Sequence, residues 1–332
     1  MNNPIVPMEL SDIFEKTFTL IGKTFFRNLI IAILFLGLPL ILIAIAADDF
    51  SSSIADLQET IKNTHAENWF DLFMTMLESL SFFGAASLLL MLASLFAEIA
   101  ISVVVREEMA SYSISVTDAI DETFSGKWLY GIGQALLKIV IFAGAVLIVV
   151  IAAVILAVVS RLLMVVFLLI CWIALVPIMI NVTLKWYFAL TAVAVDDLTA
   201  VESLRESWNM VTGYWWRTFG ILFLFSMILQ LIITIVSLPI SFGGMWNAYR
   251  EYFTILGKTG GKIDPMTMKN LEASFGPGIS ISTGVSALLT LLIAPVYTVV
   301  MYYDLRARNQ APAQTFSTPA LQDPPPMDFD GM

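Results

Sequence analysis

Residues 196–218 carry apolar side chains at intervals of three and four positions, with charged and amide side chains between them. The apolar positions are Leu198, Val201, Leu204, Trp208 and Val211. This periodicity predicts an amphipathic helix, and an apolar face of this kind is suited to a membrane interface.

The centre of this stretch, residues 204–208 (LRESW), has two earlier counterparts in the chain. Residues 14–18 (FEKTF) and 120–124 (IDETF) repeat the order of an apolar residue, two charged residues, a hydroxyl residue and an aromatic residue. The pattern predicts three units of one kind, each an amphipathic helix followed by a helical hairpin.

Long apolar runs follow these motifs and predict six transmembrane helices. A span of the hydrocarbon core needs about 20 apolar residues. The run between residues 139 and 184 contains a single charge, Arg161, so it is expected to form two spans with a tight turn near Ser160. The predicted spans cover residues 29–47, 79–105, 139–159, 162–184, 219–241 and 279–303.

Composition supports a membrane location for the whole chain. Hydrophobic residues make up 58% of the 332 residues, charged residues 13%, and the mean hydropathy is +0.85. This apolar content exceeds what one soluble core can bury, so we expect an all-α, polytopic membrane protein. The net charge of −10 argues against a nucleic-acid partner, which requires a basic surface.

The distribution of Lys and Arg predicts the topology. If all amphipathic helices lie on one face, pairs of spans separate them, and 11 of the 17 basic residues then fall on the inner side. The positive-inside rule therefore places both termini in the cytoplasm, with an acidic outer loop over residues 48–76. Residues 1–308 are expected to form the membrane domain. Residues 309–332, rich in Pro and polar residues, are expected to form a disordered cytoplasmic tail.

Catalytic and metal-binding arrangements are not recognisable in the sequence. The single histidine, His65, falls in the expected outer loop, so neither a histidine-based metal site nor a Ser-His-Asp triad can be assembled. We therefore expect no metal, no cofactor and no catalytic residues.

Ionisable residues within spans are candidates for function. Glu98 lies near the inner end of the second span, and Lys185 near the inner end of the fourth. The structural interpretation pairs these two residues with each other. The functional alternative makes Glu98 a site for a proton or a substrate.

Arginines follow aromatic pairs in the first and third units, and these residues are candidates for binding a lipid headgroup. Arg217 follows Trp215 and Trp216, and Arg27 occupies the equivalent place after another aromatic pair. Such residues ordinarily anchor a helix at the interface. A guanidinium also binds phosphate through two parallel hydrogen bonds, so a specific phosphate site is the alternative.

The last span carries small side chains at every fourth position. These are Ser282, Ser286, Thr290, Ala294 and Thr298. A stripe of small residues lets two helices approach closely in lipid, so this face is expected to pack on another span.

Part of the chain resembles the membrane domain found in bacterial glycerophosphoryl diester phosphodiesterases. The resemblance rests on LRESWNMVTGYWWRTFGILFLF, on the preceding AVAVDDLTAVES and on the terminal PVYTVVMYYDLRAR. In those enzymes a separate soluble domain performs hydrolysis, and nothing in this chain is similar to that domain. The resemblance implies a six-span module of the bacterial inner membrane, connected with lipids or with upkeep of the envelope.

Three classes of function remain open from the sequence. The first is a non-catalytic membrane module that binds lipid or an unknown membrane protein partner. A transporter of small molecules or lipids is the alternative, for which the repeats and Glu98 are the support, although repeats in transporters are often inverted. An intramembrane enzyme is the third, and it has the least support.

Overall fold

The computed structural model describes residues 6–63, 69–259 and 265–310. All regular secondary structure within these ranges is helical, which confirms the predicted all-α class. The elements in chain order are α1 (Leu10–Asn63), α2 (Trp69–Met109), α3 (Val116–Glu122), the π-helical turn η2 (Thr123–Lys127), α4 (Trp128–Val159), α5 (Arg161–Lys185), α6 (Ala189–Asp196), α7 (Ala200–Thr212), α8 (Trp215–Thr259) and α9 (Pro265–Gln310).

Six helices of the described chain are long and apolar enough to cross a membrane, in agreement with the prediction. They include α1, α2, α4, α5, α8 and α9, and each predicted span lies within one of these helices. The arrangement is consistent with a multi-pass membrane protein.

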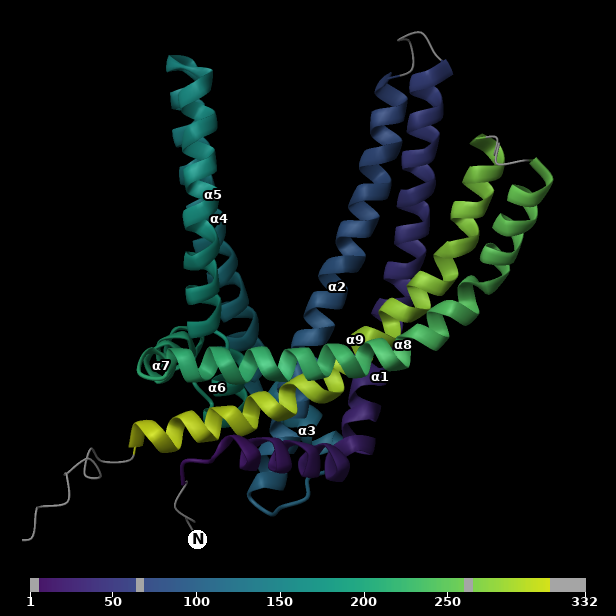
Figure 1. Cartoon of the computed structure of the whole chain (residues 1–332). Coiled ribbons are helices and arrows are strands. Elements are labelled where there is room, and N and C mark those ends of the chain that lie inside the picture. The colour runs from purple at the N-terminus through teal and green to yellow at the C-terminus, as the bar shows by residue number, and fades with distance from the viewer. Residues whose placement is uncertain (1–5, 64–68, 260–264, 311–332) are drawn as a thin grey trace, which may run out of the picture.

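The long helices form three antiparallel hairpins, α1/α2, α4/α5 and α8/α9, that diverge from a common base (Figure 1). We call this the basal end; α3, α6 and α7 lie here, as do both ends of the described chain. The first part of α1 lies along the base before the helix turns upward. Each hairpin is therefore preceded by helical residues that lie at the base, as the three sequence repeats predict.

The hairpins differ from the predicted layout in their loops. Helix α1 continues to Asn63 and α2 begins at Trp69, so most of the expected loop over residues 48–76 is helical. This stretch contains no proline, which would break a helix. A helix can therefore continue into water, because its backbone hydrogen bonds form between residues close in sequence. The turn predicted near Ser160 is confirmed, since Ser160 is extended between α4 and α5.

The amphipathic stretch of the third unit is interrupted at its start. Asp197 adopts a left-handed conformation with φ 55° and separates α6 from α7. Thr199 then caps α7 in a capping box with Glu202, whose carboxylate accepts from the Thr199 hydroxyl at 2.7 Å and from its N–H at 3.2 Å. These hydrogen bonds lower the pKa of Glu202. The helix predicted to begin at Asp196 begins at Ala200 for this reason.

Packing is concentrated near the base and around the first and third hairpins. In the most apolar 18 residues of α2, 56% of residues are buried. The corresponding share is 6% for the segment Val116–Val159, which includes α4, and 0% for the segment Arg161–Asp196, which includes α5. Helix α9 contacts α1, α2 and α8, and the largest buried side chains of the core include Tyr302, Phe188 and Phe225. The α4/α5 hairpin thus leaves a packed base with little protein around it.

Candidate functional site

The hydroxyl residue of the repeated motif is buried in all three units. Thr17, Thr123 and Ser207 have no exposed surface. Thr17 and Thr123 donate to the carbonyls four residues earlier, at 2.6 and 2.8 Å. Ser207 donates instead to the Lys185 carbonyl at 2.6 Å and accepts from the Phe188 N–H at 3.1 Å. The third copy therefore ties α7 to the segment that follows α5.

The aromatic residue that ends the motif remains exposed in every unit. The exposed fraction is 47% for Phe18, 47% for Phe124 and 36% for Trp208. Aromatic side chains at a membrane boundary typically anchor a helix at headgroup level. Lys185 also contacts Trp208 in a cation–π interaction, with its Nζ 4.1 Å from the ring centroid.

Glu98 and Lys185 do not form the expected ion pair. Lys185 is held by its cation–π contact, and the basic residue whose charge acts on Glu98 is Lys138 of α4. The physical reason is that α4 packs on α2 at this level, where Gly131 lies against Ile99. The sequence prediction paired Glu98 with α5, whereas the basic residue whose charge acts on it belongs to α4.

Each unit has an ion pair at the base that joins a residue before its first predicted span to a residue after its second. The three pairs are Arg27–Glu108 at 2.5 Å, Lys127–Asp197 at 2.7 Å and Arg217–Asp304 at 3.2 Å. These pairs close each hairpin at the base.

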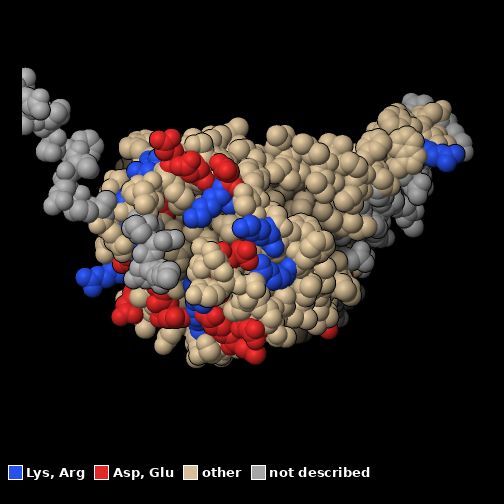
Figure 2. All heavy atoms as spheres, turned by 90° about the horizontal axis from the view of Figure 1, so that it is seen from below, with Lys and Arg blue, Asp and Glu red and all other residues tan. Residues whose placement is uncertain are grey.

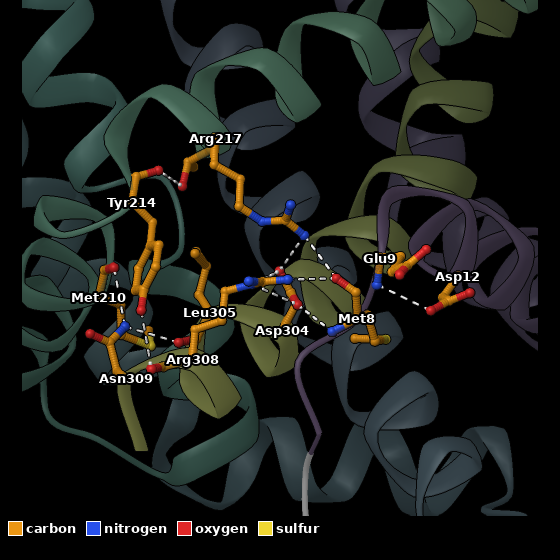
Figure 3. A network of polar contacts seen from close by, with 11 residues as sticks. Met8, Glu9, Asp12, Met210, Tyr214, Arg217, Asp304, Leu305, Arg308 and Asn309 are labelled. Atoms are coloured by element: carbon orange, nitrogen blue, oxygen red, sulfur yellow. Dashed lines mark hydrogen bonds and ion pairs between the residues drawn. The ribbon is translucent and has the colours of Figure 1, made fainter. Parts of the chain in front are cut away.

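The third pair belongs to a network that also binds the start of the described chain (Figure 3). Asp304 is completely buried and accepts from the Met8 N–H at 2.7 Å and from Arg308 at 3.1 Å. Arg217 and Arg308 both donate to the Met8 carbonyl, at 2.9 and 2.6 Å. The backbone of Met8 is thus held on both sides by α8 and α9.

A second cluster joins the first unit to the second. The Arg106 guanidinium binds Glu107 at 2.6 Å and Glu122 at 2.8 Å. Lys127 also binds Glu122, at 2.8 Å, and donates to the Ala194 carbonyl at 2.7 Å. Figure 2 shows the molecule from below, where charged side chains of both signs are intermixed over the basal face.

The two arginines that were predicted to bind a lipid headgroup form ion pairs with carboxylates of the protein. Arg27 binds Glu108 and also donates to the Ile114 carbonyl at 3.2 Å. Arg217 binds Asp304 and Met8. A phosphate would have to displace these partners, so the geometry favours a structural role for both arginines.

The two tryptophans beside Arg217 have different environments. Trp216 is 77% exposed, as an interface anchor would be. Trp215 stacks on Phe219 with ring centroids 5.4 Å apart, and its buried indole N–H has no hydrogen-bond partner in the described structure. The four predicted headgroup residues therefore lie near the base but do not converge on one site.

Sequence reasoning missed the acidic partners of the basal pairs. A signal was present, because the acids of all three pairs precede Met or Leu in REEM, DDLT and YDLR. Lys138 and the buried Gln134 were also missed, since each is a single polar residue at the edge of an apolar run.

Within the described ranges, no group of three or more His, Cys, Asp or Glu side chains is arranged to hold a metal ion. His65 lies outside the described residues.

Comparison with known proteins gives one match. A family model described as "Domain of unknown function (DUF7847)" matches residues 30–305. No curated protein matches the chain, and no solved structure does.

Proposed function

The chain belongs to the family of the Domain of unknown function (DUF7847), and for this member we propose a non-catalytic membrane module that holds phospholipid between its helical hairpins. The observation that carries the proposal is the contrast between the packed base and the diverging hairpins (Figure 1). Apolar surface that has no protein neighbour within a bilayer is covered by acyl chains.

The basal ion pairs support this proposal. Every unit closes its own hairpin by such a pair, and further pairs join the units, as for Arg306 and Asp196 at 2.5 Å. The cost of desolvating partly buried charges offsets much of their attraction, so we assign these pairs to fixing the geometry of the base. A base fixed in this way would keep the hairpins apart and leave room for lipid.

We also propose a location in a bacterial inner membrane, with both termini in the cytoplasm. The support is the excess of Lys and Arg in the segments at the basal end. The resemblance to the membrane domain of glycerophosphoryl diester phosphodiesterases favours a role in lipid handling or envelope upkeep.

The proposal is tested by native mass spectrometry of the full chain after extraction in mild detergent. We expect at least one phospholipid per chain to remain bound through washes that remove freely exchanging lipid. Complete loss of phospholipid, with a second protein retained in fixed stoichiometry, would instead favour a module that binds a protein partner.

A transporter is the second candidate, because Glu98 lies inside an apolar helix near Lys138. Flux assays in proteoliposomes separate the two functions. Substrate-dependent flux that Glu98→Gln abolishes would favour transport, whereas retained phospholipid without flux favours the lipid-holding module.

A further inference from the structure

The junction of α2 and α4, near the base, brings an acidic and a basic side chain together between two hairpins. Leu95 and Ile99 of α2 pack with Ala135 of α4 in a small apolar cluster. Glu98 and Lys138 project from these same two helices, and both are half-buried. The junction therefore joins apolar packing to two opposite charges.

These two charges lack the partners that the basal charges have. Neither Glu98 nor Lys138 makes a hydrogen bond or a direct ion pair with any other residue in the described ranges, although each lies in the other's electrostatic field. A half-buried charge without a hydrogen-bond partner is costly, so the site is incomplete as it stands.

One buried polar atom without a partner lies at the same junction. Gln134 precedes Lys138 by one helical turn and so shares its face of α4. Its side chain is only 2% exposed, and its Oε1 has no hydrogen-bond partner among the described residues. The hydroxyls of Tyr187 and Tyr297 contact each other, and both lie within the electrostatic reach of Glu98. The junction thus combines, among the described residues, an amide oxygen without a partner with a carboxylate and an ammonium group that make no direct contact.

We propose that this junction binds the headgroup of a phospholipid that carries a primary amine. The ammonium of the headgroup donates to the Glu98 carboxylate and to Oε1 of Gln134, and the phosphate accepts from Lys138. A primary ammonium has three N–H donors, whereas a quaternary choline has none, so the acceptors distinguish these lipids. The inference rests on the proposed lipid-holding function and names the lipid class.

The surroundings favour a lipid over a soluble amine. Residues farther from the base on the same two helices expose large apolar side chains, including Leu88, Met91, Val140 and Ile141. Acyl chains attached to a headgroup at the junction would lie along these surfaces. A soluble amine would leave them uncovered.

The test measures retained lipid by native mass spectrometry of the full chain, loaded from vesicles that contain equal parts of phosphatidylethanolamine, phosphatidylcholine and phosphatidylglycerol. We expect about a tenfold preference for phosphatidylethanolamine over phosphatidylcholine, which corresponds to about 1.4 kcal/mol. Glu98→Gln should remove this preference while total lipid persists. Lys138→Gln should lower retention of all three phospholipids, and Glu78→Gln, an exposed change at the far end of α2, should alter neither quantity.

The outcomes separate this inference from the proposed function. Equal retention of the three phospholipids by the unmodified chain overturns the headgroup assignment and leaves the lipid-holding function standing. Retention of no phospholipid overturns both. If Glu98→Gln fails to fold, as shown by circular dichroism, the preference of the unmodified chain still decides the headgroup assignment.

Discussion

At the scale of single residues, equivalent positions of the three units stay polar and buried while their partners differ. The motif hydroxyls of Thr17 and Thr123 donate to carbonyls of their own helical segments, whereas the Ser207 hydroxyl bonds to the end of α5 and to the segment after it. One buried position can therefore support either a single helix or a tertiary contact. The difference has measurable consequences.

Ser207→Ala should lower the free energy of unfolding by about 1 to 3 kcal/mol, because it leaves a buried N–H and a buried carbonyl without partners. Chemical unfolding in detergent, followed by circular dichroism, provides the measurement. Thr212→Ala is the matched control, since the Thr212 hydroxyl is exposed and bonds only within α7. Equal effects of the two changes would contradict the bridging role.

Asp304→Asn should destabilise the base by about 2 to 3 kcal/mol, because Arg217 and Arg308 lose the carboxylate that both of them bind. The backbone of Met8 should also become accessible, which hydrogen exchange at the start of the chain would report. Glu15→Gln serves as the control, since Glu15 is exposed. Unchanged protection of Met8 would show that this network does not hold the N-terminal segment.

At the scale of elements, the sequence was sufficient for the six long helices because their apolar runs match the thickness of a membrane. Helix ends were predicted less well. The end of α1 at Asn63 depends on the absence of breakers, and the start of α7 depends on the left-handed Asp197, which hydropathy does not encode. The Glu98–Lys138 proximity was missed because pairing of helices is set by packing around Gly131.

The capping box of α7 predicts a stability effect that depends on pH. Thr199→Ala should cost about 1 kcal/mol at neutral pH. The pKa of Glu202 is lowered in the folded state, so its contribution is present at neutral pH and is lost as pH falls through that lowered value. Unfolding of both proteins over an acidic pH series should show the difference between them shrinking. A difference that stays constant with pH would contradict the role of Glu202.

The small-residue stripe of α9 predicts a packing effect that depends on position. Ser286 contacts Ser237 of α8 at 3.2 Å, and Ala294 packs against the core, while Thr290 is exposed. Ala294→Leu should cost about 1 to 3 kcal/mol through overpacking. Thr290→Leu should be close to neutral. Thermal unfolding in detergent gives the comparison, and a neutral Ala294→Leu would mean that this part of α9 has room to expand.

At the scale of the whole molecule, three similar units produce an asymmetric assembly. The first and third hairpins share buried contacts through α9, whereas the middle hairpin is joined to the rest mainly through the base. Repetition in sequence therefore predicted the units and their order. It did not predict their relative packing, because side chains outside the repeated motif decide which faces meet.

The topology is testable with single cysteines in a Cys171→Ser background. Ser52 lies beyond the predicted first span, and Asn209 lies on α7 at the base, and both are exposed. Membrane-impermeant thiol reagents should label Ser52→Cys and Asn209→Cys from opposite sides of the membrane. Native Cys171 should react poorly because its neighbours along α5 are apolar. Labelling of both sites from one side would contradict the six-span arrangement.

The hydrogen bond from the Met8 N–H to Asp304 has a consequence for the order in which the protein assembles. These residues are 296 positions apart, so the ribosome adds Asp304 long after Met8 has been synthesised. At about 5 to 20 residues per second, the N-terminal segment waits roughly 15 to 60 s for that partner. During this interval the earlier hairpins can enter the bilayer while the base remains open. Synthesis of α9 then supplies the carboxylate that binds Met8, so we expect the base to close only after α9 has formed.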